Sequence, residues 1–263
     1  MDNALEKNTS VVKENTQAED TILENSVGEL NGTAMKLNLY ASEVVREFNS
    51  RKRQSFQVVM GETKESMASS TLNKSLKRIY ISMPRKFLDM KSDVEVDALK
   101  ILVGHELAHQ LHARMTTPAL IQVAAFVDTW GNNYKRALEE ACIETAADIL
   151  GAEMYRKEYG EITDEVYVAY QEILEGGQKE NLLNNAAAYV KFGYLPPSFR
   201  VKLMKEFSSF SSDDYAAMKK MIQYFDFICA TYLGKDPGCR RYESELVYNY
   251  RKVNFPNRIN RLR

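Results

Sequence analysis

The stretch VDALKILVGHELAHQLH, residues 96–112, decides how the middle of this chain folds and where its chemistry lies. Apolar residues recur in it at intervals of three and four, which predicts a helix with one buried face. His105 and His109 stand four residues apart in this stretch, and Glu106 follows the first of them. Four residues turn a helix by about 400° and advance it by roughly 6 Å, so both imidazoles leave the same face.

This HExxH spacing is typical of a metal site, in which the glutamate takes a proton from a water that the metal activates. The chain has three histidines, and all of them lie in this stretch. The third, His112, follows His105 by seven residues and lies about 10 Å further along the axis, too far to share a metal with it. We expect His112 to pack in the core or to support the site from outside the ligand set. Two histidines that merely pack on a core helix are the alternative interpretation of His105 and His109.

A catalytic zinc needs three protein ligands and one open position, so a third ligand must come from elsewhere. The segment ETAADILG, residues 144–151, places Glu144 and Asp148 on one helical face. Glu144 can bind the metal while Asp148 accepts a hydrogen bond from a ligand histidine. Glu140 is the competing ligand, but Glu144 alone has an aspartate four residues later. The longer HExxHxxGxxH pattern does not fit, because Met115 occupies the place of its last histidine.

The segments GHELAH (104–109) and ETAADILG (144–151) resemble the HELxH and ExxADxxG motifs of the zinc metallopeptidase family of HtpX and the CAAX prenyl endopeptidases. Weaker similarities follow at residues 192–197 and 255–259, and residues 78–82 stand where that family has an edge strand. The resemblance implies a gluzincin of zincin-like fold, one Zn²⁺ per chain, and endopeptidase activity on an extended peptide or protein substrate.

The chain also departs from that family, because no histidine follows residue 112 where the family has a late one. Arg258, Tyr248 and Tyr250 are therefore candidates for contacts with the substrate or the transition state. The same helix motifs resemble those of the ImmA/IrrE-like regulatory proteases, which cut regulators of mobile elements. A zinc-containing binding module without turnover is the third interpretation.

Composition limits the partners and the compartment. The net charge of −1 over 263 residues gives no reason to expect nucleic acid as a partner. No apolar run approaches the ~20 residues that a transmembrane helix needs. The polar, acidic start does not resemble a signal peptide, so we expect a cytoplasmic protein, with secretion through a removed signal as the alternative. Three cysteines without paired spacing predict reduced thiols.

The pattern of elements predicts an α+β fold that is mostly α, with a small β-sheet beside the zinc-binding helix. Residues 1–33 are expected to form a flexible acidic tail and 34–263 a metallopeptidase domain, in which 159–185 is a possible helical insertion over the cleft. Strands are expected at 55–60, which Gly61 ends, and at 77–83, with an exposed loop or edge over 62–75. Helices are expected at 94–114, 117–129, 134–158, 163–175, 179–192, 197–209, 212–233 and 241–250.

Overall fold

The structure, a computed structural model, describes residues 32–112, 132–177 and 194–209, together with residues 217, 220, 221 and 224. The chain divides into two compact units, residues 1–96 and 97–263. The boundary lies inside the range 34–263, which we expect to form one metallopeptidase domain, and that expectation stays a prediction. The described part is mostly helical with a small sheet, as the sequence predicts. No helix within it is long and apolar enough to cross a membrane.

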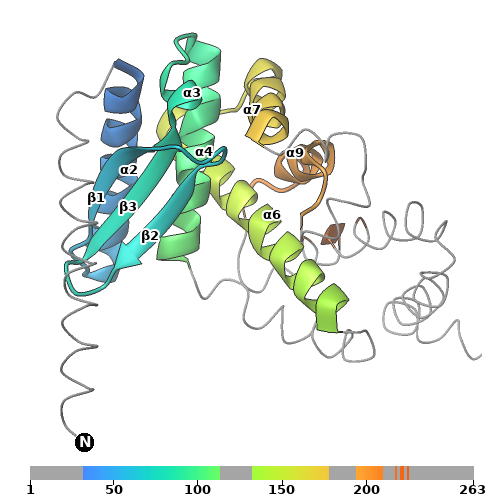
Figure 1. Cartoon of the computed structure of the whole chain (residues 1–263), viewed down its shortest axis with the longest axis horizontal. Helices are drawn as coiled ribbons and strands as arrows, with labels where there is room; N and C mark the ends of the chain where they lie inside the picture. Colours follow the sequence, from blue (N-terminus) through green and yellow to red (C-terminus); the bar gives the residue numbers. More distant parts are fainter. Residues whose placement is uncertain are drawn as a thin grey trace, which may run out of the picture. The chain divides into compact units, whose positions relative to one another are not determined.

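The described part of the N-terminal unit holds a long helix, a three-stranded sheet and a short helix. Helix α2 (Gly32–Lys52) buries an apolar stripe and packs against strand β1 (Gln57–Thr63). The order of the strands is β1-β3-β2, so β3 (Arg78–Pro84) is the central strand (Figure 1). Strand β3 pairs in parallel with β1 and antiparallel with β2 (Ser69–Asn73). The short helix α3 (Arg85–Leu88) follows β3 and contacts it.

The sheet corrects two expectations about the strands. The segment that we expected at the edge, residues 78–82, is central, because the stretch 62–75 supplies β2 as an additional strand on its far side. Strand β2 is rich in serine and threonine and largely solvent-accessible, so it lacks the apolar alternation by which a strand is recognised. Strand β1 also runs through Gly61 to Thr63, since the ladder to β3 continues there.

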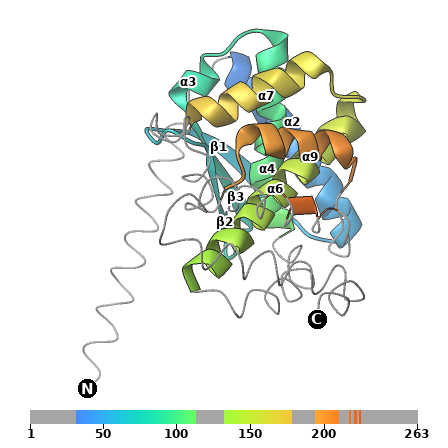
Figure 2. The same ribbon diagram turned by 90° about the vertical axis from the view of Figure 1, so that its right-hand side faces the viewer.

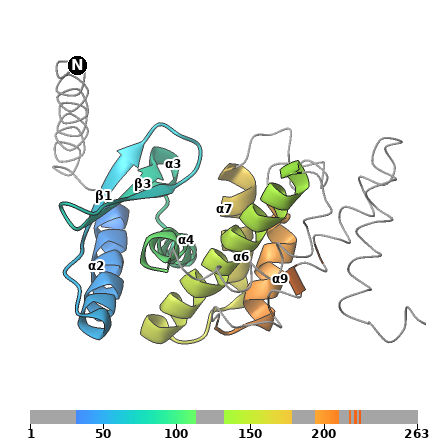
Figure 3. The ribbon, with the colours of Figure 1, turned by 90° about the horizontal axis from the view of Figure 1, so that it is seen from below.

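The described part of the C-terminal unit is built from helices. It includes α4 (Asp93–Leu111) from residue 97 onward, together with α6 (Asn132–Tyr159), α7 (Asp164–Gly177) and α9 (Pro197–Glu206). Helix α9 packs against both α6 and α7, as two views show (Figures 2 and 3). The core includes Leu99, Leu102, Ile149, Tyr170 and Leu203, all of which are nearly inaccessible to solvent.

Several expectations fall on residues that the structure does not describe. They are residues 1–31 of the expected tail, the helices at 117–129, 179–192 and 241–250, and most of that at 212–233. Within the possible insertion 159–185, α7 is described and residues 178–185 are not. Helix α4 ends at Leu111 instead of 114.

Candidate metal centre

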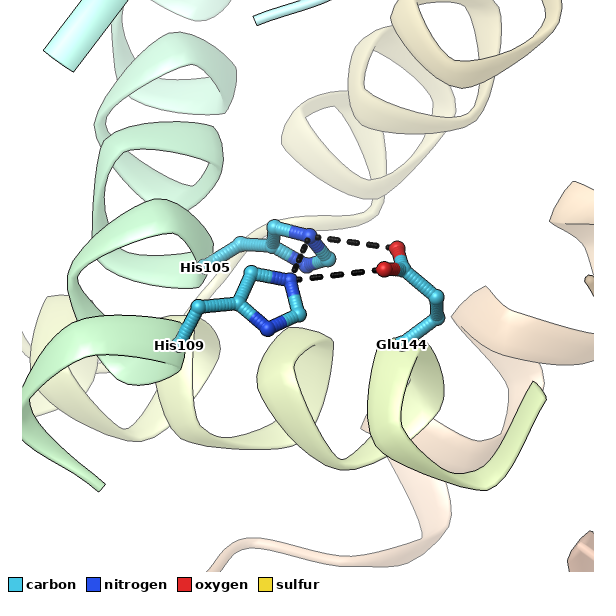
Figure 4. A group of neighbouring side chains, drawn as sticks. All are labelled: His105, His109 and Glu144. Atoms are coloured by element: carbon cyan, nitrogen blue, oxygen red, sulfur yellow. Dashed lines mark hydrogen bonds and ion pairs between the residues drawn. The ribbon is translucent and has the colours of Figure 1, made fainter. Parts of the chain in front are cut away.

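Two neighbouring segments of helix bring three potential metal ligands together. His105 and His109 project from α4 toward Glu144 on α6 (Figure 4). The two Nε2 atoms are 3.0 Å apart. His105 Nε2 is 3.4 Å from Glu144 Oε2, and His109 Nε2 is 3.5 Å from Glu144 Oε1. The predicted set of ligands therefore converges on one point, with each residue offering an atom within 4.8 Å of the others.

The start of α4 is fixed by a capping box formed by Ser92 and Glu95. The Ser92 hydroxyl accepts a hydrogen bond from the Glu95 backbone N–H at 3.2 Å, and the Glu95 carboxylate accepts one from the Ser92 backbone N–H at 3.2 Å. Such reciprocal bonds satisfy backbone donors that a helix start would otherwise leave unpaired. From this start the helix continues through the histidines to Leu111.

Two glycines let α4 and α6 approach closely at the site. A Cβ on Gly104 would lie 2.9 Å from the Cα of Gly151. A Cβ on Gly151 would lie 2.6 Å from both the backbone nitrogen of His105 and the carbonyl oxygen of Ile101. Neither distance leaves room for a side chain, so glycine is required on both helices at this crossing. The crossing sets the backbone of His105 directly against the helix that carries Glu144.

Asp148 accepts hydrogen bonds from three neighbours in a site where its own side chain is 0% exposed. His105 Nδ1 donates to its Oδ1 at 2.8 Å, as the sequence predicts. The hydroxyl of Tyr170 on α7 donates to the same oxygen at 2.6 Å. Arg200 on α9 donates through Nη2 to Oδ1 at 2.8 Å and through Nε to Oδ2. Because Nδ1 of His105 is occupied in this way, its Nε2 is the nitrogen left to face Glu144 and His109.

Arg200 is the cation that balances the buried carboxylates. Its side chain is 1% exposed, and its Nη2 also lies 3.8 Å from Glu144 Oε2. A buried charge is costly unless it is paired and hydrogen-bonded. Here one guanidinium pairs with Asp148 directly and with Glu144 at longer range. Its positive charge therefore offsets part of the negative charge of the two carboxylates.

The local electrostatics keep both acids ionised. Burial alone would raise the pKa of Asp148, but the charge of Arg200 and the hydrogen bond from His105 outweigh it and hold that pKa well below its usual range. Burial likewise opposes ionisation of Glu144, yet the nearby histidines and Arg200 lower its pKa. Ionised oxygen and neutral imidazole nitrogen are the forms in which these groups bind metals.

The same surroundings shift the pKa values of the two histidines in opposite directions. Burial favours neutral His105, but Asp148 and Glu144 outweigh burial and raise its pKa. Burial and the charge on His105 lower the pKa of His109. A divalent cation held by His105, His109 and Glu144 would take the place of the proton that the acids stabilise on His105.

The geometry of the donor atoms fits a zinc ion. Zinc binds imidazole nitrogen and carboxylate oxygen at about 2.0–2.2 Å, which in a tetrahedral site spaces the ligand atoms by about 3.3–3.6 Å. The separations of 3.4 and 3.5 Å fall within that range, and the 3.0 Å between the two Nε2 atoms lies just below it. Side chains of Glu144 and His109 remain 19% and 21% exposed, so solvent reaches this side of the ligand set.

The other residues singled out in the sequence have different outcomes. Glu106 is buried on α4, beside His105. Among the described residues, neither His112 nor Glu140 belongs to the group of converging ligands. Arg258, Tyr248 and Tyr250 lie outside the described residues.

Sequence reasoning missed Arg200 and Tyr170. A signal for both was present, because each occupies the apolar face of its helix. Arg200 is spaced with Pro197, Val201 and Met204, all of them buried. A polar or charged group at such a position needs a buried partner, and here the partner is the carboxylate of Asp148.

Comparisons of the chain with protein-family models, with curated proteins and with solved structures found no match. The functional interpretation therefore depends on the chemistry of the side chains at this site.

Proposed function

We propose that this chain is a zinc-dependent endopeptidase in which His105, His109 and Glu144 hold one Zn²⁺ and Glu106 is the general base. One observation supports this most directly: two imidazoles and a carboxylate converge within 4.8 Å, and two of the three keep access to solvent. Catalytic zinc sites have three protein ligands and an open position, whereas structural sites are closed by four. A catalytic role therefore suits the set better than a structural one.

The proposal includes a zincin-like fold of the gluzincin type. The HExxH residues lie on one helix and the glutamate ligand on the next described helix, with an aspartate one turn later that orients a histidine. This arrangement agrees with the motifs that resemble those of the HtpX and CAAX prenyl endopeptidase family. The substrate would be a peptide or protein.

Each side chain has a distinct role in the proposed hydrolysis. A bound Zn²⁺ supplies a Lewis acid that polarises the scissile carbonyl and makes water a better nucleophile. Glu106 takes a proton from the attacking water as the water oxygen bonds to the carbonyl carbon. The same carboxyl then delivers that proton to the amide nitrogen, the C–N bond breaks, and a carboxylic acid and an amine are released. Asp148 holds His105 in the tautomer whose Nε2 can bind the metal.

The metal content of purified protein tests the ligand set. Wild type should hold about one zinc per chain by elemental analysis, and Glu144→Ala should lose most of it. Glu140→Ala is the matched control, because it makes the same substitution one turn earlier on α6. This variant should keep its zinc. A wild type that takes up no zinc after reconstitution, or a Glu140→Ala variant that loses it instead, would contradict the assignment.

Turnover tests the role of Glu106. Zinc-loaded wild type should cleave fluorescently labelled, unfolded casein, and Glu106→Gln should retain its zinc but lose most of that activity, by at least about 100-fold. Equal activity in the two proteins would exclude Glu106 as the base. Zinc uptake without cleavage by wild type would favour the non-catalytic zinc module.

A further inference from the structure

Arg156 on α6 connects three helices at a point about 12 Å beyond Asp148, since each residue of the helix between them adds about 1.5 Å. Its guanidinium donates through Nη1 to the carbonyl oxygen of Ser208 at 2.7 Å. Through Nη2 it donates to the carbonyl oxygen of Met204 at 2.8 Å and to the hydroxyl oxygen of Tyr167 at 3.3 Å. One side chain of α6 therefore holds both α7 and the C-terminal end of α9.

The contacts of Arg156 repeat those of Asp148 with the charge reversed. Asp148 accepts hydrogen bonds from Tyr170 on α7 and from Arg200 on α9. The partners of Arg156 lie about one helical turn from Tyr170 on α7 and from Arg200 on α9. Helix α9 packs against both other helices (Figures 2 and 3). The two clusters of hydrogen bonds therefore hold the same three helices at two levels.

Helix α9 depends on such contacts because it is short. It has 10 residues, and helices of fewer than about 12–15 residues are only marginally stable by themselves in water. The last turn of any helix has carbonyl oxygens that lack partners within the helix, and Arg156 donates to one of these, that of Met204. A cation at this end also suits the negative end of the helix dipole. Arg156 thus fixes the far end of the helix that carries Arg200.

The position of Arg200 matters to the metal centre because of what Asp148 does there. The guanidinium of Arg200 holds the carboxylate of Asp148, and that carboxylate accepts the hydrogen bond from His105 Nδ1 at 2.8 Å. A partner that orients a ligand histidine in this way changes metal affinity by about 10–100-fold. A displacement of α9 would therefore reach the ligand through two successive side chains.

We propose that Arg156 is a positioning residue that keeps Arg200 on Asp148 and so keeps the ligand histidine in the orientation that binds zinc. The inference rests on the proposed endopeptidase function, whose zinc site it extends to a side chain outside the ligand set. Without Arg156, α9 would spend part of its time away from Asp148. If the fraction with Arg200 in place fell to about a tenth, the dissociation constant for zinc would rise about 10-fold, because only that fraction binds zinc tightly.

The first test measures the zinc dissociation constant of wild type and Arg156→Gln by competition with a chelator. Glutamine removes the cation and its forked donors, so the constant should rise about 10-fold. Arg156→Lys keeps the cation without the fork and should give an intermediate value, which also serves if the glutamine variant does not fold. Lys157→Gln is the matched control, because Lys157 is 46% exposed and pairs with Glu153 of the same helix. Its zinc dissociation constant should stay within about two-fold of wild type.

A second background separates positioning from a general loss of stability. The double variant Arg200→Met, Asp148→Asn lacks the charged pair through which Arg156 is proposed to act. In that background, Arg156→Gln should change the zinc dissociation constant by less than about two-fold, because the connection is already broken. In cobalt-substituted protein, the visible absorption reports the arrangement of ligands around the metal. Arg156→Gln should alter this spectrum when the charged pair is present, and Lys157→Gln should leave it unchanged.

An unchanged zinc dissociation constant in Arg156→Gln would overturn the inference and leave the zinc site intact. An equal rise in both backgrounds would also overturn it, and so would the failure of both Arg156 variants to fold, since Arg156 would then support the fold as a whole. Zinc uptake by wild type without cleavage of casein would remove the endopeptidase activity and leave the inference standing. A wild type that takes up no zinc would overturn the proposed function itself.

Discussion

Replacement of Gly151 by alanine should damage the metal centre without touching a ligand. The added Cβ would lie 2.6 Å from the backbone nitrogen of His105 and from the carbonyl oxygen of Ile101, whereas ordinary contact begins at 3.4 Å. The two helices would have to separate by the difference, about 0.8 Å, because neither contact is with a flexible side chain.

The consequence for the site follows from the hydrogen bond between His105 and Asp148. This bond spans the same two helices and measures 2.8 Å between Nδ1 and Oδ1. If the whole separation fell on it, the distance would become about 3.6 Å, which is no longer a hydrogen bond. Loss of such an orienting partner weakens metal binding by about 10–100-fold. Overpacking at the crossing should also reduce the free energy of unfolding by about 1–3 kcal/mol.

Two measurements check this prediction. Competition with a zinc chelator gives the dissociation constant for zinc, and urea titration of the metal-free protein gives the stability. Gly176→Ala is the matched control, because a Cβ there meets nothing within 4 Å. That variant should bind zinc like wild type and gain up to about 1 kcal/mol, the difference in helix propensity between the two residues. Unchanged zinc affinity and stability in Gly151→Ala would refute the reasoning that close approach of α4 and α6 holds the site.

Further predictions concern the partners of Asp148 and the start of α4. Tyr170→Phe removes one hydrogen bond to Asp148, which should cost about 1 kcal/mol of stability and up to 10-fold in zinc affinity. A chelator titration indistinguishable from that of wild type would exclude the effect on affinity. Arg200→Met removes the guanidinium that pairs with buried Asp148 and should cost about 3–5 kcal/mol in urea unfolding, most of which a second substitution, Asp148→Asn, should recover. Ser92→Ala removes the helix cap and should cost about 1 kcal/mol at pH 7. Hydrogen bonds from Ser92 lower the pKa of Glu95. The stabilisation is therefore present above the ordinary glutamate pKa of about 4.3 and is lost as the pH falls through the lowered pKa of Glu95. If Ser92→Ala cost the same stability at every pH, that result would contradict the capping box.

The parts of the site that depend on local helix geometry were predictable from the sequence. His105 and His109 share a face because they are four residues apart, and so do Glu144 and Asp148. Pairing one helix with the other needed only the chemistry of a three-ligand zinc site. The hydrogen bond from His105 to Asp148 and the convergence of the three side chains agree with the geometric part of these predictions, and zinc as the bound metal stays a prediction.

The parts that depend on contacts between distant segments were not predictable in the same way. Strand order is set by pairing across the sheet, and β2 offers little apolar signal, so β3 was wrongly expected at the edge. Arg200 follows Asp148 by 52 residues. Its place on an apolar helix face indicates a buried partner but does not identify the partner, because several carboxylates could meet that need.

The carboxylate of Asp148 joins four helices that are widely separated along the chain. It lies on α6 and receives hydrogen bonds from α4, α7 and α9. A change at any of these positions alters the environment of the other three, so none of them can drift independently in evolution. Among relatives of this chain, residues at positions 105, 148, 170 and 200 should therefore vary together or not at all. A substitution on α7, away from the three candidate ligands, would then behave, in a genetic screen, like a substitution of a ligand itself.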